Sequence, residues 1–407
     1  MRQKVCSTIY SENLIVIVMT RHNRIPAIDG VRGFAAAWVF LYHYVPGQNS
    51  ASFPVHLIWA VNQIDWVGVS LFFVLSGFLI SGILWDSFGD KNWWRNFYIR
   101  RSLRIFPLYF LALSIAVTIY FATGDNRGSL QHLWIYIFYL QDIPTLYGWG
   151  GHLPATAPLG HLWSLAVEEQ FYMLWPISLF FLAGKRYSAM YAIFVLWLLS
   201  FCFRVAAYKY LGPQAVYWSG GFLAGRAGEL LAGAFLALLV RGDAIENAKI
   251  YKHVPWVLYG SLAGIASIVY ADRSALLFIP LMSIVGLALL SVFFASIIAL
   301  SLRPGTIQSF FQSRFLRWLG TISYGVYVYQ LMLHPLFDLV TRRIVPDAPK
   351  STHAIVLFVV ALVGTLMSAA LSFYCFEQPL LKLKGRFSAK SRGLAPNVSE
   401  MPITANT

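Results

Sequence analysis

The sequence predicts an all-α, polytopic membrane protein with about ten transmembrane helices and both termini in the cytoplasm. Three observations carry this prediction. Hydrophobic residues make up 58% of the 407 residues and charged residues only 12%, against about 25% in an average soluble domain. The apolar residues gather in runs of roughly 20, the length that a helix needs to cross a bilayer. Aromatic residues reach 16%, which suits belts at both membrane interfaces.

Ten segments are long and apolar enough to be spans. They are residues 31–47, 67–84, 105–122, 169–184, 189–210, 221–240, 254–271, 276–300, 320–340 and 354–376. We expect each to be a helix, because the bilayer core offers no water to satisfy an open backbone. The run LWIYIFYL at 133–140 is too short to cross, so we expect it to be interfacial or re-entrant.

The basic residues orient these spans. With the N-terminus in the cytoplasm, most Lys and Arg fall in cytoplasmic connections, as the positive-inside rule requires. They are Lys91, Arg95, Arg100, Arg101, Arg104, Lys185, Arg186, Arg241, Lys249, Lys252, Arg303, Arg314, Arg317, Lys382, Lys384 and Arg386. The outer connection 48–66 has none and 123–168 has only Arg127, whereas 341–353 disagrees with Arg342, Arg343 and Lys350. Most of the pattern favours both termini inside.

The sequence predicts one membrane domain with a short segment at each terminus. We expect residues 1–24 to be a leader, either disordered or the product of a start assigned to Met1 instead of Met19. The membrane domain covers 25–384, and residues 385–407 form a disordered cytoplasmic tail. The net charge of +14 is assigned to positive-inside loops and not to nucleic acid. The three cysteines are too far apart for a metal site or a disulfide framework, and no H-E-x-x-H spacing occurs.

The first candidate motif is DGVRGFAAAWVFLYH, residues 29–43. Arg32 and His43 are eleven residues apart, so they share one helix face with a rise of about 16 Å between them. This places Arg32 at the cytoplasmic mouth and His43 near mid-membrane, and Asp29 can pair with Arg32 one turn away. Ionisable residues inside a membrane usually mark a functional path. The alternative is a histidine that only hydrogen-bonds a neighbouring helix.

The second motif is FYIRRSLRIFP, residues 97–107. Arg100, Arg101 and Arg104 form a dense cationic cluster at the cytoplasmic face. The planar guanidinium fork binds phosphate oxygens in pairs, so the cluster suits a phosphate-bearing ligand. The alternative is a topology anchor, for which Lys would serve as well.

The third motif is LGHLWSLAVEEQFYMLWP, residues 159–176. Glu168 and Glu169 are adjacent at the outer start of a span and point in different directions. They therefore cannot both be lipid-facing groups without a role. His161 and Ser164 precede them. The motif indicates an acid–base or sugar-binding site, with an interfacial anchor as the alternative.

Two further ionisable pairs lie within spans. Arg226 and Glu229 are spaced i, i+3, and His334 and Asp338 are spaced i, i+4. Both spacings suit pairing within a helix, which lowers the cost of burial. We expect structural roles for both pairs.

In this order, the motifs resemble the acyltransferase 3 family of membrane acyltransferases. The matching stretches are IDGVRGFAAAWVFLYH, GVSLFFVLSGFLIS, FYIRRSLRIFPLY, HLWSLAVEEQFYMLWP, GRAGELLAGAFLALL, LGTISYGVYVY and SFYCFEQPL, from about Ile28 to Leu380. One departure stands out. The family often has a histidine where this chain has Gln330, and His334 lies one turn further on.

The resemblance implies transfer of an acyl group, usually acetyl, from cytoplasmic acyl-CoA to a hydroxyl of a cell-surface or lipid-linked carbohydrate. It implies functional roles for Arg32 and His43, an acyl-CoA role for Arg101 and Arg104, and a role for Glu168 or Glu169. We expect no metal and a location in the bacterial inner membrane. The acceptor is a carbohydrate, a glycolipid or a small glycosylated metabolite such as a macrolide.

A second class of function fits the same residues. A proton-coupled transporter for a glycan or drug also uses buried His, Glu and Arg. No internal repeat of the kind common in transporters is visible, and a transporter does not need an arginine cluster suited to phosphate. The acyltransferase reading is therefore favoured, and the sequence fixes no oligomeric state.

Overall fold

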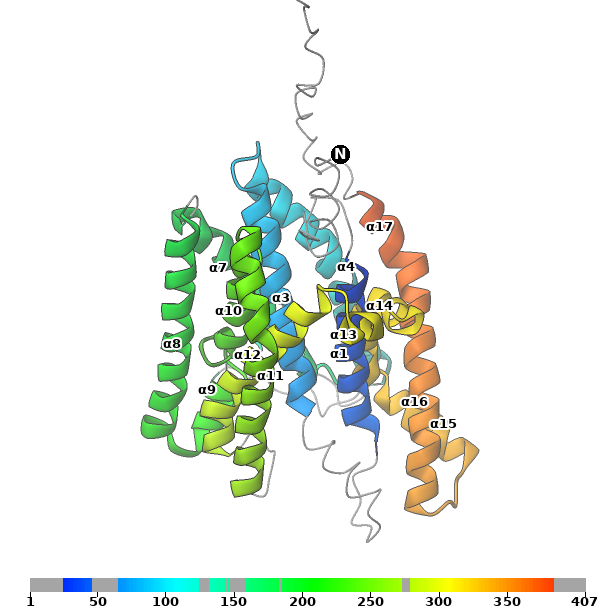
Figure 1. Ribbon diagram of the computed structural model, residues 1–407. Helices are drawn as coiled ribbons and strands as arrows, with labels where there is room; N and C mark the ends of the chain where they lie inside the picture. The colour runs from blue at the N-terminus through cyan, green and yellow to red at the C-terminus, as the bar shows by residue number, and fades with distance from the viewer. Residues whose placement is uncertain are drawn as a thin grey trace, which may run out of the picture.

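The computed structural model describes residues 25–45, 65–123, 132–143, 145, 158–182, 185–272 and 279–383. This part of the chain is helical and contains no β-strand. Its long helices run side by side, roughly along one axis (Figure 1). The leader and the tail predicted at the two ends lie outside the described residues. The predicted fold class, all-α and polytopic, is confirmed.

The helices have the following bounds: α1 Pro26–Tyr44, α3 Asp65–Ser87, α4 Trp93–Thr123, α5 Leu133–Ile137, η2 Gly160–Leu162, α7 Trp163–Leu182, α8 Arg186–Tyr210, η3 Gly212–Gln214, α9 Ala215–Gly220, α10 Leu223–Leu239, α11 Ala244–Asp272, η4 Met282–Gly286, α12 Leu287–Ser301, α13 Thr306–Phe311, α14 Arg314–Met332, α15 His334–Ile344, α16 Lys350–Ser372, η5 Phe373–Glu377 and α17 Gln378–Lys382. Within the described residues, each predicted span except 320–340 falls mainly on one long helix. The run at 133–140 forms only the short α5, as expected.

Seven helical segments are long and apolar enough to cross a membrane within the described ranges. They are Val67–Ser87, Trp93–Ala122, Arg186–Tyr210, Ala215–Leu239, Glu246–Ala271, Met282–Ser301 and Lys350–Lys382. The chain is therefore a multi-pass integral membrane protein. Three predicted spans, α1, α7 and α14, are not among the seven. They carry the ionisable residues of the candidate motifs, which lower their hydropathy, so the count of ten stays a prediction.

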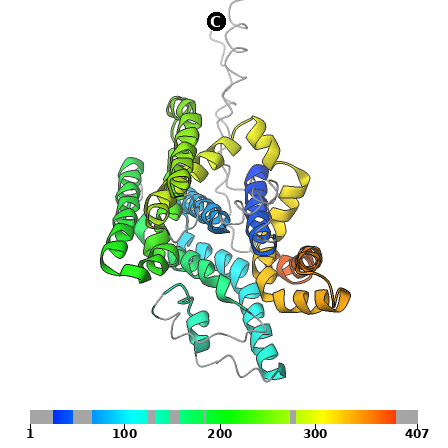
Figure 2. The same cartoon turned by 90° about the horizontal axis from the view of Figure 1, so that it is seen from below.

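Helix α3 occupies the middle of the bundle. It packs against α1, α4, α7, α10 and α12, and the view from below shows it surrounded by other helices (Figure 2). Its Gly- and Ser-rich sequence lets neighbouring backbones approach closely, which is how helices associate without a hydrophobic driving force in lipid. The centre of the fold is thus a helix with small residues on several faces.

Glycines set the closest helix contacts. A Cβ on Gly33 would overlap the Leu316 carbonyl oxygen, and one on Gly320 would overlap the Asp29 carbonyl oxygen. Helices α1 and α14 therefore touch backbone to backbone and run parallel, so that Arg32 and the middle of α14 border the same space. Gly77 of α3 and Gly233 of α10 bring those two helices equally close.

Two predicted elements differ from the structure. Helix α4 begins at Trp93, well before the predicted span at 105, so the arginine cluster lies within a helix rather than beside its start. The predicted span 320–340 is divided at Leu333 into α14 and α15. Pro335 explains the division, because it has no amide hydrogen to donate and its ring crowds the carbonyl one turn earlier.

One of the two ionisable pairs forms as predicted. Arg226 Nε lies 2.9 Å from Glu229 Oε2, and both side chains are fully buried. His334 and Asp338 form no direct ion pair or hydrogen bond among the described residues. Asp338 instead receives a hydrogen bond from Arg342 at 2.8 Å, one turn later on α15. His334 is the first residue of α15 and turns toward Tyr44 of α1.

Candidate active site

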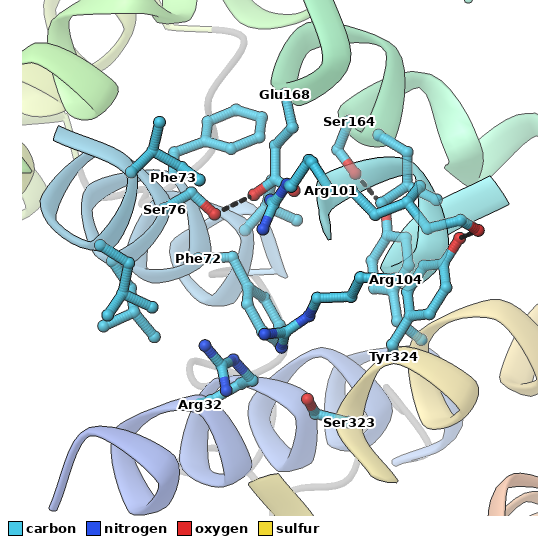
Figure 3. Close-up of a pocket in the computed structure, with 17 residues that line it drawn as sticks. Arg32, Phe72, Phe73, Ser76, Arg101, Arg104, Ser164, Glu168, Ser323 and Tyr324 are labelled. Carbon is cyan, nitrogen blue, oxygen red and sulfur yellow. Dashed lines mark hydrogen bonds between the residues drawn. The ribbon is translucent and has the colours of Figure 1, made fainter. Parts of the chain in front are cut away.

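A cavity of about 80 Å³ lies between α1, α3, α4, α7 and α14 (Figure 3). Each of these helices contributes polar side chains to its wall. They are Arg32, Ser76, Arg101, Arg104, Ser164, Glu168, Ser323, Tyr324 and Tyr327. Apolar residues, most of them from α3 and including Phe72 and Phe73, complete the lining. A polar cavity enclosed by five helices of a membrane protein is the leading candidate for a functional site.

The arginines make the cavity strongly cationic. The Arg101 guanidinium stacks 3.7 Å from the centre of the Tyr172 ring and lies beside Glu168 (Figure 3). Arg104 has no hydrogen bond or ion pair with any other described residue, and the charges of Arg32 and Arg101 act on it more strongly than the opposite charge of Asp29. Three guanidinium groups that face one space repel one another, and an anion placed between them would remove that repulsion.

Glu168 is the carboxylate of the cavity. Its Oε1 accepts a hydrogen bond of 2.6 Å from Ser76 of α3. Glu169 is the next residue, turned by about 100° around the helix, and it does not line the cavity. It is buried, and its Oε1 has no hydrogen-bond partner among the described residues.

The placement of the carboxylates corrects one expectation. The sequence indicated arginines near the cytoplasmic face and Glu168 near the outer face. The structure brings Glu168 and Arg101 into one cavity. Two features account for this: α4 starts three turns before Arg104, and α7 starts more than one turn before Glu168. Both side chains therefore lie inside the bundle instead of at its opposite ends.

Arg32 lies almost two turns into α1 and lines the cavity, whereas His43, near the C-terminal end of the helix, does not line it. Arg32 Nη1 lies 3.4 Å from Asp29 Oδ1, as the spacing predicted. His43 Nδ1 lies 2.7 Å from the Val39 carbonyl oxygen. A carbonyl can only accept, so Nδ1 carries the hydrogen and donates it. The Nε2 of His43 is then unprotonated in the neutral ring and is able to take up a proton.

A second set of polar contacts joins α7 to α14. Ser164 and Tyr327 share a hydrogen bond, and the Tyr327 hydroxyl also approaches the His161 carbonyl oxygen at 2.6 Å. The His161 Nε2 donates to the Val328 carbonyl oxygen at 3.2 Å. This leaves His161 Nδ1, which is buried without a partner among the described residues, as a proton acceptor.

His161 is held in its neutral form. It lies in η2, before the membrane helix α7 begins. Burial, and then the nearby His43, lower the pKa of His161 from 6.5 to about 3. His161 and His43 are therefore close enough to influence each other, although 118 positions separate them in the sequence.

Arg100 stands apart from the other site arginines. Its Nε donates to the Asn96 carbonyl oxygen at 3.1 Å, and it does not line the cavity. Sequence reasoning overlooked Ser76, Tyr172 and Tyr327. All three lie within motifs that were recognised, in SGFLIS, EEQFY and SYGVYVY, but polar residues of this kind are also common in helix packing.

The position where the family often has histidine is fully buried here. Neither the oxygen nor the nitrogen of the Gln330 side chain has a partner among the described residues. The Tyr44 hydroxyl donates to the Gln330 carbonyl oxygen, and His334 Nδ1 lies 3.3 Å from the same hydroxyl. His334 is thus linked to position 330 through Tyr44 and does not occupy its place. In the ranges that the structure covers, no three His, Cys, Asp or Glu side chains gather as metal ligands.

Comparison with known proteins agrees with the motifs. A family model described as an acyltransferase domain matches residues 25–375. A Bacillus subtilis protein provisionally named as a peptidoglycan O-acetyltransferase is 29% identical, over 95% of this chain and 59% of its own length. The peptidoglycan O-acetyltransferase of Listeria monocytogenes is also 29% identical, over 89% of this chain and 57% of its own. No solved structure matches.

The chain spans less than three fifths of the length of these two relatives. The matched region nevertheless contains all the candidate site residues, from Asp29 to Glu169. The relatives are bacterial, and this chain is a multi-pass protein of the bacterial membrane.

Proposed function

We propose, from the premise that this chain belongs to the acyltransferase family whose model covers residues 25–375, that it is a membrane-embedded O-acetyltransferase. It moves an acetyl group from cytoplasmic acyl-CoA to a carbohydrate hydroxyl. The observation that carries the proposal is the cationic cavity: Arg101 and Arg104 of α4 and Arg32 of α1 face one space, and Arg104 forms no hydrogen bond or ion pair with a carboxylate of the described residues.

The arginine cavity suits the phosphates of the donor. Guanidinium groups bind phosphate oxygens through charge-assisted hydrogen bonds, and burial strengthens each of them. Glu168 balances part of the positive charge beside Arg101. Arg100 supports the donor only through the charge it adds near the cavity.

Helix α1 sets the path of the donor. With its phosphates at Arg32, the pantetheine arm extends along α1 toward His43, about 16 Å further on. Ser164 and Tyr327 line the cavity, and the Tyr327 hydroxyl joins them to His161, which lies outside the lining near His43. The thioester at the end of this arm then lies near His43 and His161, both of them neutral.

His43 acts as the general base. Its Nε2 takes the proton of the acceptor hydroxyl while that oxygen attacks the thioester carbonyl carbon. The carbon–sulfur bond then breaks, the acetyl group stays on the acceptor oxygen, and the CoA thiolate recovers the proton from the imidazolium. Proton transfer by a positioned histidine contributes roughly 10²–10⁴-fold in rate. Glu169, buried beside this path, is the candidate to order the acceptor.

A covalent route uses the same residue. In it, Nε2 attacks the thioester itself, CoA leaves, and the acyl-imidazole passes the acetyl group to the hydroxyl. To separate the two routes, the enzyme is incubated with radiolabelled acetyl-CoA in the absence of acceptor, and the reaction is then quenched. Label held on the wild type and absent from His43→Ala supports the acyl-imidazole, whereas unlabelled protein with active turnover supports the general base.

The acceptor we propose is a cell-wall carbohydrate or its lipid-linked precursor. The support comes from the two relatives described above, which are named for peptidoglycan. A bacterial membrane location gives access to such acceptors. A macrolide or another small glycosylated metabolite is the second candidate, since it too presents sugar hydroxyls.

Mass spectrometry of surface glycans and glycolipids tests the proposal. Cells express wild type, His43→Ala, the control His253→Ala at an exposed position on α11, or nothing. We expect a base-labile gain of one acetyl unit with wild type and control, and a loss of about 100-fold or more with His43→Ala.

Two results would count against the proposal. Full acetylation by His43→Ala would remove His43 from the reaction. Uptake or export of an unmodified glycan, with no acetylated product in cells or medium, would favour the proton-coupled transporter instead.

A further inference from the structure

A second hollow opens where α1 begins. Its volume is about 380 Å³, and its wall is formed by Pro26, Asp29, Arg314, Arg317, Trp318 and Thr321. These residues come from the first turn of α1 and the first two turns of α14. Both turns lie at the end of the bundle that the basic connections predict to be cytoplasmic. We call this space the α14 hollow.

The α14 hollow carries positive charge that is exposed to a ligand. Arg314 and Arg317 are exposed, and neither side chain has a hydrogen bond or ion pair with another described residue. Asp29 is the acidic residue of the wall, and it is buried and paired with Arg32. Trp318 is half-buried, so one part of its ring borders the hollow.

The α14 hollow and the arginine cavity are lined by successive turns of the same two helices, α1 and α14. Asp29 lines the hollow, and its partner Arg32 lines the cavity, one helical turn further along α1. On α14, Arg317 and Thr321 line the hollow and Tyr324 and Tyr327 line the cavity. The rise from Arg317 to Tyr327 is about 15 Å, so one elongated molecule is able to occupy both spaces.

We propose that the α14 hollow binds the adenosine 3′-phosphate end of acyl-CoA. Arg314 and Arg317 take the 3′-phosphate, and Trp318 stacks against the adenine. The diphosphate then reaches Arg32 and Arg104, and the pantetheine arm continues toward His43. This inference rests on the proposed use of acyl-CoA as donor.

Two arginines and a tryptophan at a membrane surface would also suit an anionic lipid headgroup. The elongated donor accounts for more of the geometry, because α1 and α14 line both the hollow and, further along, the buried cationic cavity. A lipid headgroup needs no second space. One measurement separates the two ligands. If the hollow binds CoA, removal of the 3′-phosphate weakens the binding of CoA, whereas it has no effect if the hollow binds a lipid headgroup.

Equilibrium binding tests the assignment without any knowledge of the acceptor. The full chain is reconstituted in nanodiscs of neutral lipid, and the Kd is measured for acetyl-CoA and for 3′-dephospho-acetyl-CoA. We expect wild type to bind acetyl-CoA at least about tenfold more tightly, since hydrogen bonds to a charged phosphate are among the strong ones. Arg314→Ala and Arg317→Ala should lose that preference. Each should bind acetyl-CoA more weakly than wild type and bind 3′-dephospho-acetyl-CoA as wild type does.

Three variants act as controls. Arg317→Lys keeps the charge and should retain part of the preference. Arg343→Ala, an exposed arginine on α15 that lines neither space, should bind both donors as wild type does. Trp318→Phe should bind more tightly than Trp318→Ala if the ring stacks on adenine.

The outcomes separate the two proposals. If wild type prefers acetyl-CoA and the arginine variants keep that preference, the hollow is not the nucleotide site, and the donor proposal stands. A wild type that binds both donors equally also overturns the hollow assignment and favours a lipid headgroup. If wild type binds neither donor, acyl-CoA is not the donor and both proposals fall.

Discussion

Arg104 shows how a single residue trades stability for binding. Its neighbours in the cavity include two other arginines, whose repulsion outweighs the attraction of Asp29, and it forms no ion pair with a carboxylate of the described residues. Like charges at close range destabilise the empty site, more so where solvent is excluded. Such residues are retained where the binding of a ligand of opposite charge offsets the destabilisation.

We predict opposite effects on stability and binding for Arg104→Met. The variant should unfold at the same or a higher temperature than wild type, because repulsion from Arg32 and Arg101 is removed. It should bind acetyl-CoA roughly tenfold more weakly or worse. Thermal unfolding in detergent and a binding titration measure the two effects. A variant that is both unstable and weak in binding would mean that Arg104 holds the fold together.

His161 makes stability depend on pH. Its pKa is lowered to about 3 in the folded chain, against 6.5 for a free imidazole, because burial disfavours the charged ring. Between these two values the unfolded chain binds a proton that the folded chain does not. Stability is therefore complete above about pH 6.5 and falls as the pH drops below it.

The prediction is a difference between two chains, since other groups titrate in the same range. From pH 6.5 to pH 5, wild type should lose more stability than His161→Gln, by up to about 1.4 kcal/mol per pH unit. Thermal unfolding over this range measures the slope for each. Equal slopes would show that His161 is not kept neutral by the fold.

At the scale of the helix, contacts between glycines position the site. Gly33 and Gly320 let α1 and α14 meet backbone to backbone, which sets Arg32 against the face of α14 that carries Tyr324 and Tyr327. A side chain at either glycine would push the two helices apart. The arginine would then move relative to the rest of the cavity.

Gly33→Ala should destabilise the chain by about 1–3 kcal/mol, the usual cost of overpacking, and should also weaken donor binding. Gly260→Ala on α11 is the matched control. Nothing lies within 4 Å of a Cβ at that position, so alanine should be neutral or stabilising by its helix propensity. The two melting temperatures are compared in one detergent. Equal stability would contradict the close contact of α1 and α14.

The break after α14 also has a role at this scale. Because Pro335 ends the helix, His334 starts a new direction and meets Tyr44 instead of continuing down the α14 face. An uninterrupted helix, as the apolar pattern predicted, would have kept His334 near the line of Tyr327 and Gln330. The histidine that the family often has at position 330 is therefore not replaced by one simply shifted along the same face.

At the scale of the whole molecule, the orientation predicted from the basic residues is open to a direct test. The connection before α4 and the one before α11 should face the cytoplasm, and the connection between α15 and α16 should face outward. In Figure 1 the first two lie at one end of the bundle and the third at the other.

Cysteine labelling measures this orientation. Cys6, Cys202 and Cys375 are first replaced by serine, and single cysteines are placed at exposed Lys91, Lys249 and Asp347. A membrane-impermeant maleimide should label Asp347→Cys in intact cells, and the other two only after permeabilisation. The reverse pattern would invert the topology and would place the α14 hollow outside, away from cytoplasmic CoA.

The sequence by itself determined the fold class, most of the helices and the family. Hydrophobic runs of the length of a bilayer leave helices as the solution that satisfies their backbone, and the order of seven motifs is specific to one family. The pairs Asp29–Arg32 and Arg226–Glu229 were also predictable, because their partners lie within one helical turn.

Only the tertiary structure decided which motifs meet. Arg32, Arg101 and Glu168 lie on three helices, and spacing along one helix says nothing about depth or contact across helices. The helix starts at Trp93 and Trp163 decided the depth of the arginines and carboxylates, and glycine contacts decided which helices touch. The same contacts placed Arg314 and Arg317, which the sequence offered only as loop charges, in a hollow beside the first turn of α1.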